Sequence, residues 1–189
     1  MKRIAILASG AGSNAANIIS YFESKKIAEV VLVASNKPDA GVLKIASNHA
    51  IPTYLITREN FTTSNIFATY LQSLEVDLIV LAGFLWKVPE NLVKLFPQQI
   101  INIHPALLPK YGGKGMYGHH VHAAVHAAGE KESGITIHWV NEHYDEGAII
   151  AQYRVHLEDS DTPADIERKV RALEMQWFPH EIENVLTNC

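Results

Sequence analysis

Short apolar runs alternate with amphipathic segments along the first hundred residues of the chain. Two of these runs, Val30–Ala34 and Leu78–Ala82, are hydrophobic without interruption, which is typical of parallel strands covered on both faces. The segments between the runs repeat apolar residues at helical spacing. In the third such segment, the residues expected on one side are Ile66, Tyr70, Leu71 and Leu74. The alternation predicts an α/β fold: a single Rossmann-like, doubly wound domain over residues 1–189, with a mostly parallel sheet and helices on both faces.

The same pattern assigns a range to each element. The expected strands are Arg3–Ala8, Glu29–Ala34, Thr53–Ile56, Leu78–Ala82, Ile100–His104, Gly134–Val140 and Ala148–His156. The expected helices are Asn14–Lys25, Gly41–His49, Thr63–Leu74, Pro89–Phe96, His119–Ala128 and a final helix from Pro163 to about Leu186. Thr162 is expected to cap the final helix, with Asp165 completing an acidic form of the capping box. Pro179 is a candidate for a bend in that helix.

Composition narrows the class of protein. The net charge of −4 shows no excess of basic residues, so nucleic acid is not an expected partner. The one cysteine, Cys189, excludes an intramolecular disulfide and suits a reducing compartment. The first apolar run, Ile4–Ala8, is too short to span a membrane and leads into a glycine turn instead of a cleavage site. We therefore expect a soluble, cytoplasmic protein. The sequence leaves its oligomeric state open between a monomer and a homodimer.

The run Ile100–His104 ends by presenting a carboxamide and an imidazole just before Pro105. A period of two places Asn102 and His104 on the same face of a strand. Asparagine supplies donors for an oxygen that gains negative charge, and histidine holds or moves a proton near neutral pH. The pair predicts the acyl-transfer half of an active site, although polar residues at a strand end also serve simply to cap a turn.

The first glycine-rich turn, Ser9–Ala15, matches G-x-G-x-x-A between a strand and a helix. Such a turn exposes main-chain amides at a helix N-terminus and suits a phosphate. A nicotinamide-binding fold also needs an acidic residue at the end of the second strand. That strand ends in Ala34–Lys37, and Asp39 comes too late. A phosphate is therefore favoured over a dinucleotide; the alternative is that the glycines only permit a tight turn.

The second glycine-rich segment, Gly113–Gly118, spells G-x-G-x-x-G but follows no strand directly. A mobile loop beside the active site is the better interpretation, with Lys114 either solvated or facing an anion. Four clustered histidines follow: His119, His120, His122 and His126. They lack the H-E-x-x-H pattern of zinc hydrolases and no cysteine cluster accompanies them, so no metal site is expected.

Four blocks of the chain occur, in this order, in one enzyme family. They are Ser9–Asn14, Leu81–Phe84, Asn102–Tyr111 and the turn Asp145–Gly147. On these blocks the chain resembles the phosphoribosylglycinamide formyltransferases, folate-dependent enzymes of purine biosynthesis. The third block is specific to folate-dependent formyltransferases as a group. Within that group, methionyl-tRNA formyltransferases add a carboxy-terminal domain and formyltetrahydrofolate hydrolases an amino-terminal regulatory domain. The length of this chain favours the stand-alone transformylase.

The resemblance implies a mechanism at matching positions. Asn102 and His104 would surround the formyl carbon of the co-substrate 10-formyltetrahydrofolate while the glycine amine of glycinamide ribonucleotide attacks it. Asn102 would hydrogen-bond the oxyanion, and His104 would stabilise it as imidazolium and assist proton transfer. The charge of Asp145 would raise the pKa of His104. His138 matches a further active-site histidine of the family.

The resemblance also implies contacts with the ribonucleotide. Gly12, Ser13 and Asn14 match the segment that binds its phosphate-bearing end, in agreement with the helix N-terminus argument. Glu174 matches an acidic residue on the last helix that contacts the ribose. Ala15-Ala16 departs from the Leu-Gln that is more usual after this turn.

For the folate, the resemblance implies a site along the segment after the fourth strand, next to Asn102. Its residues are Leu85, Trp86, Lys87 and Val88, whose main chain would hydrogen-bond the pterin-like ring. Arg58 matches a basic residue that reaches the carboxylate tail. Trp86 stands where many relatives carry arginine, and the loop Gly112–Gly118 is longer than in many relatives.

Three other functions use the same residues. A formyltetrahydrofolate hydrolase would use water as the nucleophile, and an amino-sugar nucleotide formyltransferase would use another amine. A non-catalytic regulator would bind folate or nucleotide without turnover. The full set of Asn102, His104 and Asp145 favours an enzyme over the regulator.

Overall fold

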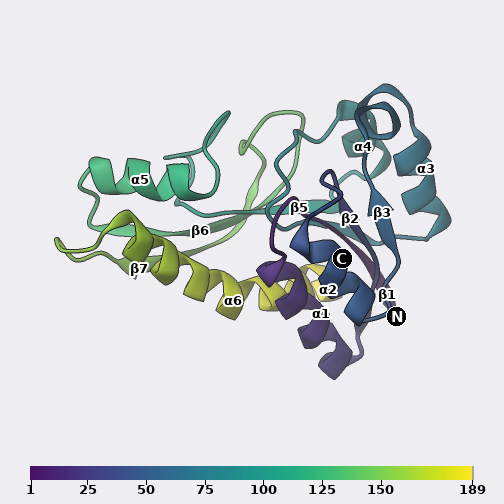
Figure 1. Ribbon diagram of the computed structural model, residues 1–189, viewed down its shortest axis with the longest axis horizontal. Coiled ribbons are helices and arrows are strands. Elements are labelled where there is room, and N and C mark those ends of the chain that lie inside the picture. The colour runs from purple at the N-terminus through teal and green to yellow at the C-terminus, as the bar shows by residue number, and fades with distance from the viewer. Residues whose placement is uncertain (189) are drawn as a thin grey trace.

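A seven-stranded sheet organises the chain in the computed structural model, which describes residues 1–188 (Figure 1). The strands are β1 (Lys2–Leu7), β2 (Ala28–Ser35), β3 (Thr53–Leu55), β4 (Leu78–Leu81), β5 (Ile100–His104), β6 (Glu132–Trp139) and β7 (Ile149–His156). The helices are α1 (Ser13–Lys25), α2 (Gly41–Asn48), α3 (Ile66–Ser73), α4 (Glu90–Leu95), α5 (His119–Ala127) and α6 (Pro163–Asn188), with a π-helical turn η1 (Glu59–Thr63). Cys189, on which the redox expectation rested, lies outside the described residues.

The strand order is β3-β2-β1-β4-β5-β6-β7. The pairs among β1 to β5 are parallel, whereas β6 runs antiparallel to both β5 and β7. From β1 the chain moves outward to β2 and β3, and it then returns to place β4 on the other side of β1. In an open α/β sheet, such a reversal leaves a crevice at the carboxyl ends of the two central strands, and ligands bind there. The topology thus directs attention to the turns after β1 and β4.

Both faces of the sheet are covered, as the uninterrupted apolar runs predicted. Along β1, Ile4 and Ile6 pack into one core while Ala5 and Leu7 pack into the other. The first core collects α1, α2, α5 and α6, and the second collects α3, α4 and the η1 turn. Figure 1 shows α1, α2 and α6 together on one side and α3 and α4 apart from them. The predicted doubly wound, mostly parallel fold is confirmed.

The final helix, α6, continues through Pro179 to Asn188. A proline inside a helix removes the hydrogen bond to the carbonyl four residues earlier, which here belongs to Met175. The side chain of Asn17 on α1 donates to that carbonyl at 2.7 Å. The interrupted turn of α6 is thereby satisfied by α1, and the two helices are held together beside the turn that follows β1.

Two local predictions need correction. The predicted helix 63–74 is two elements, because a π-helical turn ends at Thr63 and α3 begins only at Ile66. Ile66 was placed on the buried side but is 57% exposed, while Phe67 and Leu71 enter the core. The helix starts three residues later than its pattern indicated, and its first residue, Ile66, stays exposed to solvent. The capping box of α6 is confirmed: the Thr162 N–H donates to the Asp165 carboxylate, and the Asp165 N–H donates to the Thr162 hydroxyl.

A membrane span was not expected from the sequence. Over residues 1–188, none of the helices combines the length and the apolar stretch that crossing a bilayer requires.

The two glycines of the first turn make a matched pair for mutation. Gly12 has a φ of 87°, and an added Cβ would lie 2.8 Å from Val42 of α2. Gly10 has an ordinary φ and nothing within 4 Å of an added Cβ. We expect Gly12→Ala to lower the free energy of unfolding by about 1–3 kcal/mol and Gly10→Ala by less than about 0.5 kcal/mol. Urea denaturation measures both, and equal losses would contradict this account of the turn.

Candidate active site

A cleft of about 740 Å³ opens at the carboxyl ends of the central strands. It lies where the strand order reverses, between the turn after β1 and the loop after β4. The predicted site residues that line it are Gly12, Ser13, Asn14, Leu85, Trp86, Lys87, Val88, Asn102, His104, His138, Asp145 and Glu174. Arg58 does not line the cleft itself. It stacks on Trp86, which does.

Strand register brings Asn102 and His138 together. β5 and β6 pair antiparallel with Asn102 directly opposite His138, so both side chains emerge on the same face. The ring Nδ1 of His138 lies 2.9 Å from the carbonyl of Trp139. Because a carbonyl only accepts, this nitrogen carries the proton, and Nε2 accepts from the Asn102 amide at 3.1 Å. The Asn102 amide keeps a second N–H for another acceptor.

His104 lies two residues further along β5 and is only 3% exposed. Its Nε2 lies 2.7 Å from the carbonyl of Tyr111 and donates to it. Its Nδ1 lies 3.6 Å from Oδ2 of Asp145. In the neutral ring, Nδ1 is therefore unprotonated and faces a carboxylate. This nitrogen can accept a proton, and the resulting imidazolium would face the Asp145 carboxylate.

Asp145 reaches the histidines from the loop between β6 and β7. Its Oδ2 accepts the Gly113 N–H at 2.9 Å, and its Oδ1 lies 3.6 Å from Nε2 of His138. The loop passes so close to β6 that a Cβ on Gly147 would lie 1.6 Å from the carbonyl of Trp139. Only glycine permits this approach, which accounts for the Asp-x-Gly spacing of the turn.

Burial and charge oppose each other at His104. Burial of the ring lowers its pKa most, while the Asp145 carboxylate and the bond to the Tyr111 carbonyl raise it. The net result is a pKa below the ordinary value of 6.5. Asp145 acts in the predicted direction, but burial outweighs the effect of the carboxylate on the pKa of His104. His104 is therefore a neutral base at pH 7.

Asp145 shows the reverse balance. Burial raises the pKa of the carboxyl group. His138, His104 and the Gly113 N–H lower it, and together their effect is larger than that of burial. The net pKa lies below the ordinary value, so Asp145 is a carboxylate at neutral pH. A neutral imidazole beside a fixed negative charge is ready to accept a proton and to form an ion pair.

The other end of the cleft is built on the N-terminus of α1. Gly12 precedes the helix in a left-handed conformation, and Ser13 begins it with an exposed side chain. Asn14 donates to Glu174 of α6 at 2.8 Å. Burial raises the pKa of Glu174, although the Asn14 bond and Arg171 act against it. Free main-chain amides and a carboxyl group thus face the same space.

The segment after β4 forms a third wall. The hydroxyl of Ser9 receives the Leu85 N–H at 2.9 Å and donates to Asn36 at 2.5 Å. Ser9 therefore ties together the ends of β1, β2 and β4. Among the described residues, no hydrogen bond is recorded for the main-chain amides of Trp86 and Lys87. Those two amides stay available to a ligand, whereas that of Leu85 is already engaged.

Comparison with known proteins agrees with this geometry. The family model described as formyl transferase matches residues 2–182. The chain belongs to the formyl transferase family. It is 40% identical over 184 residues to phosphoribosylglycinamide formyltransferase of Haemophilus influenzae, covering 95% of this chain and 84% of that one. A crystal structure of the Anaplasma phagocytophilum phosphoribosylglycinamide formyltransferase matches with a TM-score of 0.90 at 32% identity, covering 98% of this chain and 87% of that one.

The plant relatives are longer than this chain. The chain is 40% identical over 175 residues to the chloroplastic phosphoribosylglycinamide formyltransferase of Arabidopsis thaliana, covering 89% of this chain. It spans 60% of the length of that protein and 60% of the corresponding protein of Vigna unguiculata.

Several residues of the cleft were not identified from the sequence. Lys37 follows β2 at the same sheet edge, and Arg171 lies three residues before Glu174 on α6. That helical spacing was a usable signal for Arg171. His122 of α5 also lines the cleft, and its Nδ1 is buried without a hydrogen-bond partner in the structure. Nothing in its sequence context separated His122 from the neighbouring histidines.

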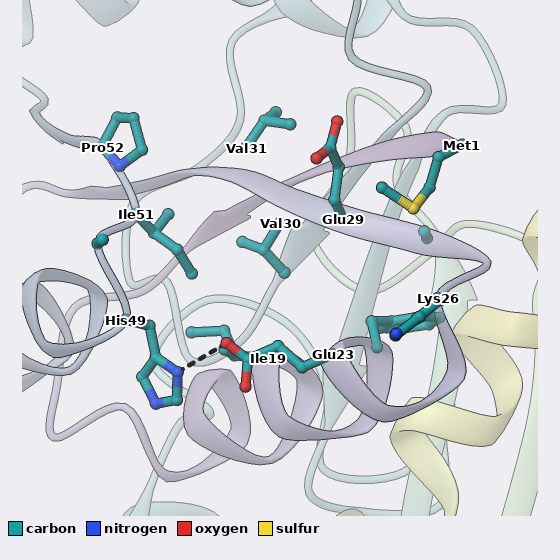
Figure 2. Close-up of a pocket in the computed structure, with 13 residues that line it drawn as sticks. Met1, Ile19, Glu23, Lys26, Glu29, Val30, Val31, His49, Ile51 and Pro52 are labelled. Atoms are coloured by element: carbon teal, nitrogen blue, oxygen red, sulfur yellow. Dashed lines mark hydrogen bonds and ion pairs between the residues drawn. The ribbon is translucent and has the colours of Figure 1, made fainter.

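A second hollow of about 510 Å³ lies at the opposite, amino-terminal end of β2 (Figure 2). Figure 2 shows the hydrogen bond between Glu23 and His49 on its wall, and Lys26 and Glu29 line other parts of the hollow. It contains none of the predicted site residues. Within residues 1–188, no three His, Cys, Asp or Glu side chains are grouped so as to hold a metal ion.

The balance at His104 predicts its titration. Because the imidazolium is stabilised by Asp145, Asp145→Asn is expected to move the pKa of His104 further below 6.5. NMR titration of the His104 ring measures this shift. Asp159→Asn removes an exposed carboxylate that pairs with Lys131 and does not line the cleft, and it is expected to leave the His104 pKa unchanged. A rise or no change in Asp145→Asn would contradict the assigned contact.

Proposed function

We propose that the chain transfers the formyl group of 10-formyltetrahydrofolate to the glycine amine of glycinamide ribonucleotide. The products are formylglycinamide ribonucleotide and tetrahydrofolate, as in de novo purine biosynthesis. The observation that carries the proposal is the meeting of Asn102, His104 and Asp145 in one cleft with the N-terminus of α1. The relatives named as phosphoribosylglycinamide formyltransferases support the same reaction.

The reaction forms one bond to the formyl carbon and breaks another. The amine nitrogen attacks the formyl carbon, and the formyl oxygen becomes an oxyanion. The second N–H of Asn102 donates to that oxyanion. The amine must then lose a proton, and N10 of tetrahydrofolate must gain one as it leaves. Neutral His104, with Nδ1 facing Asp145, takes up the proton and returns it.

The two substrates divide the cleft between them. The ribonucleotide phosphate suits the main-chain amides at Gly12 and Ser13, near the positive charges of Lys37 and Arg171. Glu174, held by Asn14, is placed for the ribose hydroxyls. This arrangement orients the glycine amine towards the end of β5.

The folate donor occupies the wall formed by Leu85, Trp86, Lys87 and Val88. The unengaged amides of Trp86 and Lys87 suit the polar edge of the pterin-like ring, and Asn102 lies where that ring must present its formyl group. Arg58, beyond Trp86, is placed to meet the carboxylate tail. His138 orients Asn102 through the hydrogen bond between them.

Residues 1–189 act in this proposal as one formyltransferase domain with two small-molecule substrates. The proposed setting is the cytoplasm, and neither nucleic acid nor a membrane takes part. The choice between monomer and homodimer stays a prediction from the sequence.

Mutation of the catalytic group tests the proposal. We expect Asn102→Ala to lower kcat about 100- to 1000-fold because one oxyanion donor is lost. His104→Ala and Asp145→Asn are expected to lower kcat at least about 100-fold, since proton transfer loses its base or the charge beside it. The assay is formyl transfer from 10-formyltetrahydrofolate to glycinamide ribonucleotide.

A matched control separates chemistry from folding. Asn184→Ala changes an asparagine near the end of α6, away from the cleft, and is expected to keep wild-type kcat. Circular dichroism and thermal unfolding compare the four variants with the wild-type chain. Full activity of the His104 variant would contradict the assigned mechanism.

A further inference from the structure

Arg58 and Trp86 form a stack at the edge of the cleft. The guanidinium carbon of Arg58 lies 4.0 Å from the centroid of the Trp86 ring. Trp86 lines the cleft, whereas Arg58 does not. A ligand tail that leaves the cleft past Trp86 therefore meets the guanidinium next. Such a stack is attractive because the ring face is negative and the guanidinium is planar and cationic.

The Trp86 ring is fixed from behind. It packs against Phe61, with ring centroids 6.2 Å apart, and against Phe84 at 6.4 Å in an edge-on arrangement. Phe61 is itself 2% exposed and belongs to the core beneath α3 and α4. Because these neighbours belong to the tightly packed core, the Trp86 ring at the rim of the cleft has little freedom to move.

The main chain around Arg58 is also fixed. Thr57 and Asn60 exchange hydrogen bonds, from the Thr57 N–H to the Asn60 side chain at 2.9 Å and from the Asn60 N–H to the Thr57 hydroxyl at 3.2 Å. Arg58 lies between them, immediately before the η1 turn. The turn thus fixes the main chain of Arg58, and the Trp86 ring holds its guanidinium.

The guanidinium of Arg58 is free to bind an anion. Among residues 1–188, no carboxylate lies within ion-pair distance of it, and no hydrogen bond of its side chain is recorded. Stacking uses the face of the guanidinium and leaves its in-plane N–H groups, which match a carboxylate in bidentate geometry. Lys87 adds a second exposed positive charge on the same wall, while the neighbouring Glu90 pairs with Lys94.

We propose that Trp86 is a positioning residue that presents Arg58 to the glutamate carboxylates of the folate donor. The inference rests on the proposed function, because it takes folate as the ligand. An arginine at position 86 would contact a carboxylate with its own charge. Tryptophan instead immobilises the arginine that is already present, so less conformational freedom is lost on binding. The side chain at position 86 thereby contributes to recognition of the tail of the donor, while its main-chain amide faces the ring.

The test compares two donors across four variants. One donor is 10-formyltetrahydrofolate, and the other is 10-formyltetrahydropteroyl methylamide, in which a neutral methylamide replaces the glutamate. We expect Trp86→Ala and Arg58→Ala each to raise the KM of the glutamate donor about tenfold, the scale of one charged hydrogen-bonded contact, with a much smaller change in kcat. Trp86→Phe retains an aromatic face and is expected to recover most of the affinity. The double variant is expected to lose no more than Arg58→Ala alone.

The methylamide donor and a control variant show which outcomes would contradict the proposed role of Trp86. With that donor, Trp86→Ala is expected to raise KM clearly less than with the glutamate donor, since no carboxylate remains to be recognised. Arg154→Ala removes an exposed arginine of β7 outside the cleft and is expected to match the wild type with both donors. An equal loss with both donors in Trp86→Ala, or additive losses in the double variant, would overturn the inference.

Binding separates this inference from the proposed function. The affinities of tetrahydrofolate and of tetrahydropteroyl methylamide are measured by calorimetry with the same variants. If the wild type transfers no formyl group yet prefers tetrahydrofolate in a manner that depends on Trp86, the proposed function fails and the inference stands. If neither compound binds, both fail. Equal affinity of the wild type for the two compounds overturns the inference alone.

Discussion

The carboxylate of Asp145 is the contact through which three distant segments of the chain meet. One oxygen takes the N–H of Gly113 and faces His104, and the other faces His138. One carboxylate thereby contacts the loop after β5, the end of β5 and strand β6. Asp145 occupies this position only because Gly147 lets its loop lie against β6. A side chain at position 147 would push the loop away from β6 and separate the Asp145 carboxylate from His104.

This carboxylate also sets the chemistry of its neighbour. Burial alone would hold His104 as a weak base, and the negative charge counteracts part of that effect. The imidazole stays neutral in the resting site but acquires a stabilised cationic form when a proton arrives at Nδ1. In the proposed reaction, Asn102, oriented by His138, supplies the complementary donor for developing negative charge. In that proposal, proton acceptance and oxyanion binding come from one strand, two residues apart.

The sequence predicted those parts of the site that depend on local periodicity. Asn102 and His104 share a face because side chains alternate along a strand, and the turn around Gly12 lies before a helix. The pairing of Asn102 with His138 could not be derived locally, because it depends on the register of an antiparallel strand 36 residues away. The resemblance identified His138 as an active-site histidine, and the structure shows that it pairs with Asn102.

Other features depend on tertiary packing that no local pattern encodes. The lowered pKa of His104 follows from its burial, which a single strand does not specify. The stack of Arg58 on Trp86 joins a turn after β3 to a loop after β4. The late start of α3 follows from a π-helical turn whose sequence resembles an ordinary helix start. Resemblance placed Arg58 and Trp86 separately, and only the structure shows them in contact.

The central claim is that the cleft joins a formyl donor to an amine acceptor. The most direct measurement is tetrahydrofolate release from 10-formyltetrahydrofolate, with and without glycinamide ribonucleotide. The account predicts release only when the ribonucleotide is present, with one formylglycinamide ribonucleotide formed for each tetrahydrofolate. Equal release without the ribonucleotide would contradict it and indicate a hydrolase. No release in either condition would contradict it as well and direct attention to another amine or to binding alone.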